Sequence, residues 1–146
     1  MRTNKVVWSE GLFLRPQLFQ QQERYFEYYA HKRASTLSPF FWGFSQYEID
    51  REALSYGKLV LRTARGVLPD GTPFDVPDHA DLPEPLTILP EHLGKTIYLA
   101  VPLRLDNSDE TIFSQHDASS LARFRAQETE LCDTNAIRQG PKPVQL

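Results

Sequence analysis

The sequence predicts a mainly β fold, a β-sandwich preceded by one N-terminal amphipathic α-helix. Helical periodicity is strongest in the first quarter of the chain, and alternating apolar runs follow it. Six of the eleven prolines lie between Pro69 and Pro90, where they exclude a helix. We therefore expect a single domain over residues 1–146, made of an arm (1–15), a helix (16–34) and a β-sandwich (40–146). A chain of 146 residues is long enough to bury the core of one such domain.

The arm is predicted to consist of two short extended apolar runs. Residues 6–8 and 12–14 are the runs, and the Ser-Glu-Gly sequence at 9–11 indicates a turn between them. Pro16 suits the first helical position, because its missing N–H would have no intrahelical partner there. Arg15, which the proline forces out of the α region, is then the boundary residue.

The helix is predicted to be amphipathic. One face of the helix is a stripe of residues spaced three or four apart. The stripe consists of Phe19, Gln22, Phe26, Tyr29, Ala30 and Arg33, and the neighbouring residues Leu18 and Tyr25 widen it. The opposite side is polar, and we expect His31 there to be solvated. Two interpretations stay open. The helix lies on the rest of the domain as a core helix, or part of its stripe, with Trp8 and Phe13, forms a subunit or partner interface.

A hairpin and a bulge are predicted for the middle of the chain. Residues 58–68 and 72–76 are β-type runs, and Pro69-Asp70-Gly71 between them supplies the backbone angles of a tight turn. Upstream, aromatic and apolar residues switch faces, which indicates a bulge near Ser45-Gln46. Residues 51–56 fit a turn or one helical turn that Gly57 ends.

Three further segments complete the prediction. Residues 86–89 fit a brief strand, and 96–105 show the clearest alternation in the chain, with Pro102 placing that strand at an edge or bulge. Residues 118–131 carry both a loose helical and an alternating pattern, with a slight preference for helix. Residues 144–146 fit the start of a strand.

Composition and charge exclude several classes of protein. A net charge of −3 provides no basic field for nucleic acid. No apolar run approaches the ~20 residues of a membrane span, and the N-terminus lacks the pattern of a secretory signal. The single cysteine, Cys132, cannot form an internal disulfide, which fits a reducing compartment. We expect a cytoplasmic protein.

The sequence contains no recognisable catalytic constellation. It has no glycine-rich phosphate loop, no HExxH and no G-x-S-x-G. Cys132 precedes an acidic residue, which would raise rather than lower a thiol pKa. The four histidines (His31, His79, His92 and His116) show no metal-ligand spacing. We predict that the chain is no enzyme, binds no small-molecule substrate, and needs no cofactor and no metal.

One alternative function stays open, a ligand-binding β-sandwich of lectin-like or calcium-dependent type. It would use the exposed aromatics Tyr98 and Trp42 with a proline-stiffened acidic loop. The loop's candidate ligands are Asp75, Asp78, His79 and Asp81. The order of ligands found in an EF-hand is absent, and prolines restrict the loop.

Several stretches together resemble the TssK family, the baseplate subunits of bacterial type VI secretion systems. Residues 7–22, VWSEGLFLRPQLFQQQ, resemble the family's opening. Later pieces agree in order: Trp42-Gly43, Ile49-Asp50, 66–74 (GVLPDGTPF), 99–103 (LAVPL) and 123–133. The resemblance covers nearly the whole chain. Leu18 departs from it, since the family commonly has His there, and this favours apolar packing at that position.

The resemblance implies a structural adaptor. Family members are similar to phage receptor-binding proteins, with an N-terminal β-sandwich shoulder, a helical neck and a C-terminal head, assembled as homotrimers. The shoulder docks on the wedge subunits TssF and TssG, and the head reaches the cytoplasmic parts of the inner-membrane complex. This chain resembles the shoulder alone, so we expect it to lack the head and its contact. The family also favours strand for residues 121–132.

Together, these observations predict a protein-binding surface on the arm and the start of the helix. With the helix packed across the sandwich, the arm's apolar residues would face a partner. The predicted interface residues are Trp8, Leu12, Phe13, Pro16, Leu18 and Phe19.

Overall fold

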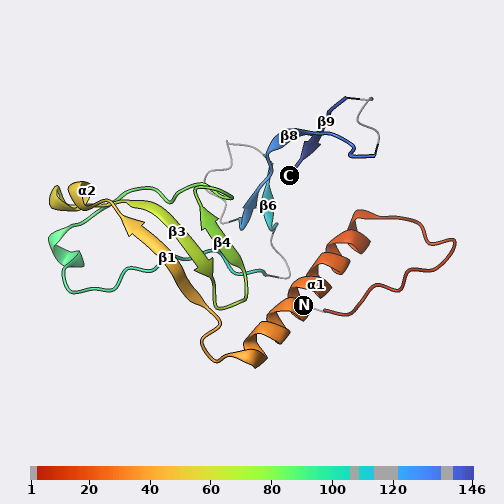
Figure 1. The fold of residues 1–146 in the computed structure, drawn as a ribbon, viewed down its shortest axis with the longest axis horizontal. Helices are drawn as coiled ribbons and strands as arrows, with labels where there is room; N and C mark the ends of the chain where they lie inside the picture. The colour runs from red at the N-terminus through yellow and green to blue at the C-terminus, as the bar shows by residue number, and fades with distance from the viewer. Residues whose placement is uncertain (1–2, 106–108, 114–121, 136–139) are drawn as a thin grey trace. The chain divides into compact units, whose positions relative to one another are not determined.

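The structure is a computed structural model that describes residues 3–105, 109–113, 122–135 and 140–146 (Figure 1). The chain divides into two compact units, residues 1–95 and 96–146, and each is described by itself. The elements confirm the prediction of a mainly β fold with one long N-terminal helix. Among the described residues, no helix combines the length and the apolar character needed to cross a membrane.

Helix α1 (Pro16–Leu37) begins where the sequence predicts and ends three residues later than the predicted position 34. Pro16 occupies the start of the helix, and Arg15 before it is extended, with φ −133° and ψ 147°. At the other end, Thr36 Oγ1 donates a 2.6 Å hydrogen bond to the Lys32 carbonyl. Pro39 forces Ser38 out of the α region, and Ser38 is extended at φ −148° and ψ 135°, so the helix ends before it.

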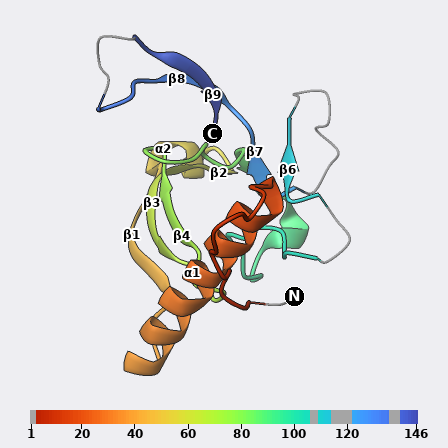
Figure 2. The same ribbon diagram turned by 90° about the vertical axis from the view of Figure 1, so that its right-hand side faces the viewer.

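A three-stranded antiparallel sheet is the centre of the first unit. Its strands lie in the order β1 (Gly43–Ile49), β3 (Leu61–Val67) and β4 (Pro73–Val76), as Figures 1 and 2 show. The β3–β4 hairpin confirms the predicted one: Leu68 N–H donates to the Thr72 carbonyl at 2.8 Å. The predicted bulge is also confirmed, since the β1–β3 register shifts between Phe44 and Gln46.

One face of this sheet carries the core. Tyr47, Ala64 and Val76 lie side by side across the three strands, and Ala64 is fully buried while Val76 is 7% exposed. In the next row, Phe44 and Phe74 flank Gly66, and their rings meet edge to face with centroids 5.5 Å apart. A side chain on Gly66 would overlap both the Phe74 ring and the Gly43 carbonyl, so the missing Cβ lets the two rings meet.

Short elements close the end of the sheet opposite α1. Helix α2 (Arg51–Ser55) is the predicted single helical turn, capped by Asp50, whose carboxylate accepts from Ala53 N–H at 3.0 Å. Strand β2 (Lys58–Leu59) pairs antiparallel with β5 (Leu86–Thr87), which confirms the brief strand predicted over 86–89. A 3₁₀ turn, η1 (Pro90–His92), follows.

The second unit contains two pairs of short strands. Strands β6 (Thr111–Ile112) and β7 (Phe124–Arg125) are parallel, whereas β8 (Glu128–Leu131) and β9 (Lys142–Gln145) are antiparallel. The strand assignment for 121–132 is therefore confirmed over 124–125 and 128–131, while Leu121 lies outside the described residues. The strand predicted at 144–146 is confirmed as β9.

The strand predicted over 96–105 is wrong, because none of these residues is in a strand. In the described chain, the segment pairs with no neighbouring strand. Arg123 Nη1 donates to the Pro102 carbonyl at 2.9 Å, so a side chain takes an acceptor that a ladder would use. Alternation of apolar residues favours a strand only where a neighbour supplies hydrogen bonds.

Candidate functional site

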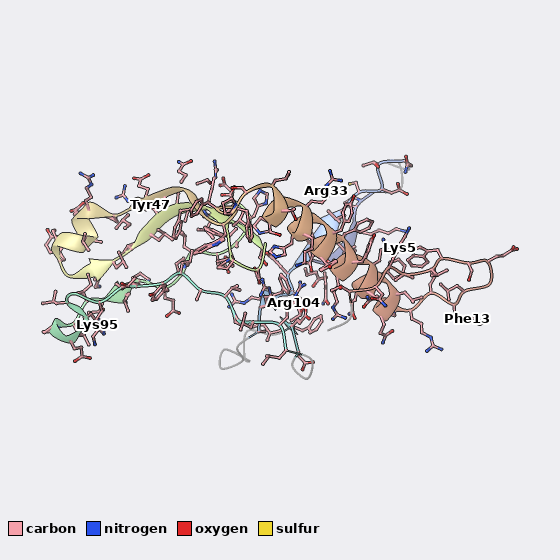
Figure 3. All side chains as sticks on the ribbon, turned by 90° about the horizontal axis from the view of Figure 1, so that it is seen from below. Lys5, Phe13, Arg33, Tyr47, Lys95 and Arg104 are labelled. Atoms are coloured by element: carbon pink, nitrogen blue, oxygen red, sulfur yellow. The ribbon has the colours of Figure 1, made fainter. Side chains whose placement is uncertain are left out.

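The arm is an extended hairpin-like segment with an apolar tip. Leu12 N–H donates to the Ser9 carbonyl at 3.2 Å, and Gly11 between them has φ +80°. This confirms the turn predicted at 9–11. Phe13 lies beyond the turn and is 83% exposed. Figure 3 shows Phe13 on the arm, well away from the sheet that carries Tyr47.

Two contacts hold the base of the arm against α1, and a valine at the base is nearly buried. Val6 is only 8% exposed. Gln21 Nε2 donates a 2.7 Å hydrogen bond to the Asn4 carbonyl. The ring of Trp8 lies 5.8 Å from that of Phe19, at an interplanar angle of 51°. The base is therefore attached to the first turns of the helix, while the tip extends past it.

The structure brings some of the six predicted interface residues together and separates others. Trp8 and Phe19 are in ring contact, and both are about half exposed. Leu12 is 38% exposed and Phe13 is 83% exposed. Pro16 lies exposed at the start of α1, and Leu18 is half-buried. Because successive helical residues point about 100° apart, Leu18 and Phe19 belong to different sides of the helix.

Helix α1 exposes its aromatic stripe. None of its residues is buried. Phe19, Phe26 and Tyr29 are 55%, 57% and 47% exposed. The sequence left open whether α1 is a core helix or part of an interface. In the described chain α1 is not a core helix. The prediction that His31 is solvated is wrong: it is half-buried, with its ring edge-on to Phe41 at 5.2 Å.

Basic side chains lie over two exposed tyrosines in the last turns of α1. Lys32 Nζ lies 5.9 Å from the centre of the Tyr28 ring, and the Arg33 guanidinium lies 5.6 Å from that of Tyr29. Arg33 also donates a 2.9 Å hydrogen bond to the Tyr29 hydroxyl. Such i,i+4 pairs stabilise an exposed helix. These contacts stabilise the exposed tyrosines within the helix itself, without packing against the sheet.

An aromatic groove at the start of β1 was not predicted. Its volume is about 650 Å³. The only signal in the sequence is the aromatic run at 40–42, and the rest of the lining comes from the distant β3–β4 hairpin. The lining includes Phe41, Trp42, Phe44, Arg65, Phe74 and His79.

Arg65 fixes the polar side of the groove. Its guanidinium pairs with Asp75 at 2.9 Å and with Asp78 at 2.5 Å. The hydrogen bonds that Arg65 donates, to Asp75 first and then to Asp78, raise the pKa of Arg65 above its usual value. The arginine is therefore permanently charged and held in place by two carboxylates.

The proposed calcium loop is arranged differently from a cation site. Asp75 and Asp78 are engaged by Arg65, and His79 N–H donates to the Asp75 carbonyl at 2.9 Å. Across the described residues, no group of three or more His, Cys, Asp or Glu side chains is arranged to hold a metal ion. Trp42 lines the groove of the first unit, whereas the exposed Tyr98 belongs to the second unit.

The remaining candidates for chemistry have structural or solvent-exposed positions. Cys132 is a free, exposed thiol. His92 Nδ1 accepts a 3.2 Å hydrogen bond from Leu89 N–H and closes the turn η1. His116 lies outside the described residues.

Comparisons with known proteins give a consistent relationship. The family model described as "Bacterial Type VI secretion, VC_A0110, EvfL, ImpJ, VasE" matches residues 18–146. The "Type VI secretion system baseplate component TssK1" of Pseudomonas aeruginosa is 42% identical over 143 residues, which is 98% of this chain and 32% of that protein. The chain therefore spans about a third of the length of this curated relative.

Solved structures agree with the sequence match. A crystal structure of TssK superposes with a TM-score of 0.87 at 39% identity, over 99% of this chain and 33% of that one. A chain of a TssK-TssF-TssG baseplate subcomplex, seen by cryo-electron microscopy, has a TM-score of 0.76 at 24% identity, over 100% of this chain and 48% of that one. The second similarity shows a shared fold. The family match and the 42% identity together show that this chain belongs to the bacterial type VI secretion family of TssK, ImpJ and VasE.

Proposed function

We propose that the chain is the N-terminal shoulder domain, residues 1–146, of a non-enzymatic adaptor in a type VI secretion baseplate, and that its arm and the start of α1 dock on protein partners. The proposed partners are TssF and TssG, which are assembled with TssK in a related complex. Assembly as a homotrimer, and contact with the inner-membrane complex through a C-terminal head, belong to the same proposal for the whole protein. This role places the protein on the cytoplasmic side of the bacterial inner membrane.

The exposed apolar tip of the arm is the observation that carries this proposal. Phe13 and Leu14, which follow the turn, are 83% and 67% exposed, and Val7, which precedes it, is 81% exposed. Burying one such side chain against a partner contributes roughly 1.5–3 kcal/mol. Three of them on one short segment are typical of a surface that another protein covers.

The attachment of the arm supports a docking role rather than a free tail. The Gln21–Asn4 hydrogen bond and the Trp8–Phe19 contact fix the base before any partner arrives. A segment that is already ordered loses less conformational entropy on binding than a flexible one. In this arrangement Phe13 and Leu12 insert into the partner, and Trp8 and Phe19 form the platform behind them. Pro16 and Leu18 extend the interface to a second side of the helix start.

The test replaces Phe13 by serine and measures affinity for the purified cognate TssF–TssG complex. Phe113→Ser is the matched control, because Phe113 is also exposed, at 71%, but belongs to the second unit. If Phe13 is an interface anchor worth about 2 kcal/mol, its loss weakens binding roughly 30-fold. Circular dichroism and the melting temperature should be unchanged in both variants.

Equal affinities of the Phe13→Ser and Phe113→Ser variants would contradict the proposed site. A parallel loss for Trp8→Ala, with Phe13→Ser unchanged, would contradict the role of the tip and assign binding to the platform. A folded wild-type chain that fails to bind TssF–TssG at all would contradict the partner assignment itself.

A calcium- or sugar-dependent function is not proposed. Two of the loop's three carboxylates already have a guanidinium partner, so a cation would have to displace Arg65 from Asp75 and Asp78. Replacing the Arg65 guanidinium by a calcium ion would gain little binding free energy, because one favourable charge pairing is lost for each one formed.

A further inference from the structure

The side chain of His31 makes an unusual contact between α1 and the turn of the β3–β4 hairpin. Its ring lies edge-on to Phe41, at 5.2 Å and 71°. It also lies directly on Gly71, since a Cβ placed on that glycine would overlap the imidazole ring. Three residues far apart in the sequence thus meet at one point, between the helix, the segment before β1 and the hairpin turn.

Gly71 meets two demands at this point. Its φ of +90° is a conformation that side chains disfavour, and the turn requires it after Asp70. The absence of a Cβ also makes room for the imidazole. The hairpin turn is therefore built so that it can receive the His31 ring.

The same contact leaves a polar atom without a partner. His31 Nδ1 is buried, and no described residue makes a hydrogen bond to it. A buried, unpaired polar atom costs free energy, because the water it had in the open state is not replaced. The packing of the ring on Phe41 and Gly71 favours the closed contact, and the unpaired nitrogen opposes it. Two such opposing terms produce a contact that opens easily.

We propose that His31, Phe41 and Gly71 form a latch that sets the direction of α1 relative to the β1-β3-β4 sheet. When the latch opens, α1 swings about residues 38–42, the segment that joins it to β1. The arm moves with the helix, because the Gln21–Asn4 hydrogen bond and the Trp8–Phe19 contact attach it there. The latch therefore controls where the tip of the arm points.

Phe41 connects the latch to the aromatic groove. It contacts His31 and also lines the groove with Trp42 and Phe44. A group that enters the groove and moves the Phe41 ring acts on the latch as well. Occupation of the groove and the direction of the arm are coupled through this one side chain.

The experiment measures a distance across the joint in the full chain. Cys132→Ser removes the native thiol, and spin labels are attached at Gln20→Cys on α1 and Tyr56→Cys beyond α2, both exposed positions. Double electron–electron resonance then gives the distribution of the distance between the labels. The variants compared are His31→Phe, His31→Ala and Gly71→Ala. Gly94→Ala is the control, since Gly94 also has a positive φ, +73°, but no atom lies within 4 Å of its Cβ position.

The latch predicts that the distance distribution changes in opposite directions in the His31→Phe and His31→Ala variants. His31→Phe keeps the ring and removes the unpaired nitrogen, so the distribution should narrow. His31→Ala and Gly71→Ala remove one side of the contact or occupy its place, so the distribution should broaden or gain a second population. Gly94→Ala should match the parent. Because His31→Ala leaves the turn intact, it tests the latch even if Gly71→Ala fails to fold.

Two outcomes would overturn the latch. One is an identical narrow distribution in all variants, which would mean that other contacts fix the helix. The other is a broad distribution in the parent that His31→Phe does not narrow. The distance measurement does not use TssF or TssG, so a result that contradicts the latch leaves the proposed function untouched.

Discussion

The three-stranded sheet and the arm–helix segment of the first unit are both rich in aromatic residues, yet they use them differently. In the sheet, Phe44 and Phe74 close over Gly66, and the row beside them buries Ala64 completely. Along the arm and α1, rings pair locally, as Trp8 does with Phe19, but remain about half exposed. Phe44 is itself 51% exposed, so the two regions differ in what their rings cover, a paired sheet backbone in one and neighbouring side chains of the arm and a single helix in the other.

The difference follows from what lies beside each ring. Strand register places small residues of β3 between the aromatics of β1 and β4, so the rings cover a hydrogen-bonded backbone. Helix α1 forms its backbone hydrogen bonds within itself and pairs with no strand. Its rings therefore contact one another or the side chains of Lys32 and Arg33. Composition alone does not distinguish the two uses.

The largest effect is expected from adding one methyl group to the sheet. Gly66→Ala places a Cβ onto the Gly43 carbonyl and the Phe74 ring, so β1 and β3 must separate. We expect the free energy of unfolding to fall by about 3 kcal/mol, the upper part of the range for overpacking. Urea unfolding followed by circular dichroism measures it.

Gly11→Ala is the matched change in the arm. Gly11 has φ +80° but open space around its Cβ position. The penalty of about 1 kcal/mol for alanine in this conformation is relieved by local rearrangement of the arm. The unfolding midpoint of the sheet should stay the same. A loss equal to that of Gly66→Ala would mean that the arm is part of the cooperative core.

A smaller effect is expected from a matched pair of valines. Val76, on β4, is 7% exposed, whereas Val7, in the arm, is 81% exposed. Truncation to alanine at Val76 should cost about 1.5 kcal/mol, the value of two buried methylene equivalents. The same truncation at Val7 should leave stability unchanged. Similar losses at both positions would show that the arm packs more tightly than the structure indicates.

The smallest effect concerns the cap of α2, at the far end of the sheet from the arm. The Ala53 N–H first, and then the Arg62 guanidinium, which lies 3.0 Å away, hold the pKa of Asp50 below its usual value. The carboxylate therefore stabilises the folded state above the pKa of the unfolded carboxyl group. This contribution is lost as the pH falls through the lowered folded value.

Melting temperatures of wild type and Asp50→Ala, measured from neutral pH down to pH near 3, check this linkage. The variant should melt slightly lower at neutral pH, and the difference should shrink on acidification. A difference that stays constant with pH would show that Asp50 acts through something other than its charge. Because the partner side chain of Arg62 is 54% exposed and solvent screens the pair, we expect this shift to be smaller than that of Val76→Ala.

Local chemistry accounts for the parts of the fold that the sequence predicted. The start of α1 follows from Pro16, and the β3–β4 turn follows from Pro69-Asp70-Gly71. The bulge in β1 follows from a change of face near Ser45. In each case the responsible residues are neighbours in the chain, so their preferences are readable without the fold.

The features that were missed depend on residues distant in the sequence. The groove joins the run 40–42 to the β3–β4 hairpin, and the half-buried His31 lies against both Phe41 and Gly71. The segment 96–105 alternates well but has no ladder partner in the described chain, and its Pro102 carbonyl bonds to the Arg123 side chain. For the predicted interface, the sequence indicated the apolar residues of the arm. It did not indicate that Trp8 and Phe19 form a separate ring contact at the base.

The bulge at Ser45 has a consequence for handling the protein. Strand β1 is at the edge of its sheet, seven residues long, and in the described chain no strand covers its outer side. Open edges of this kind recruit strands from other molecules and seed precipitates. The bulge, anchored where Ser45 Oγ donates to the Arg65 carbonyl at 3.2 Å, breaks the regular row of amides that such growth requires. Deleting Ser45 would remove this irregularity from the open edge, and we expect the variant to aggregate more readily than the parent.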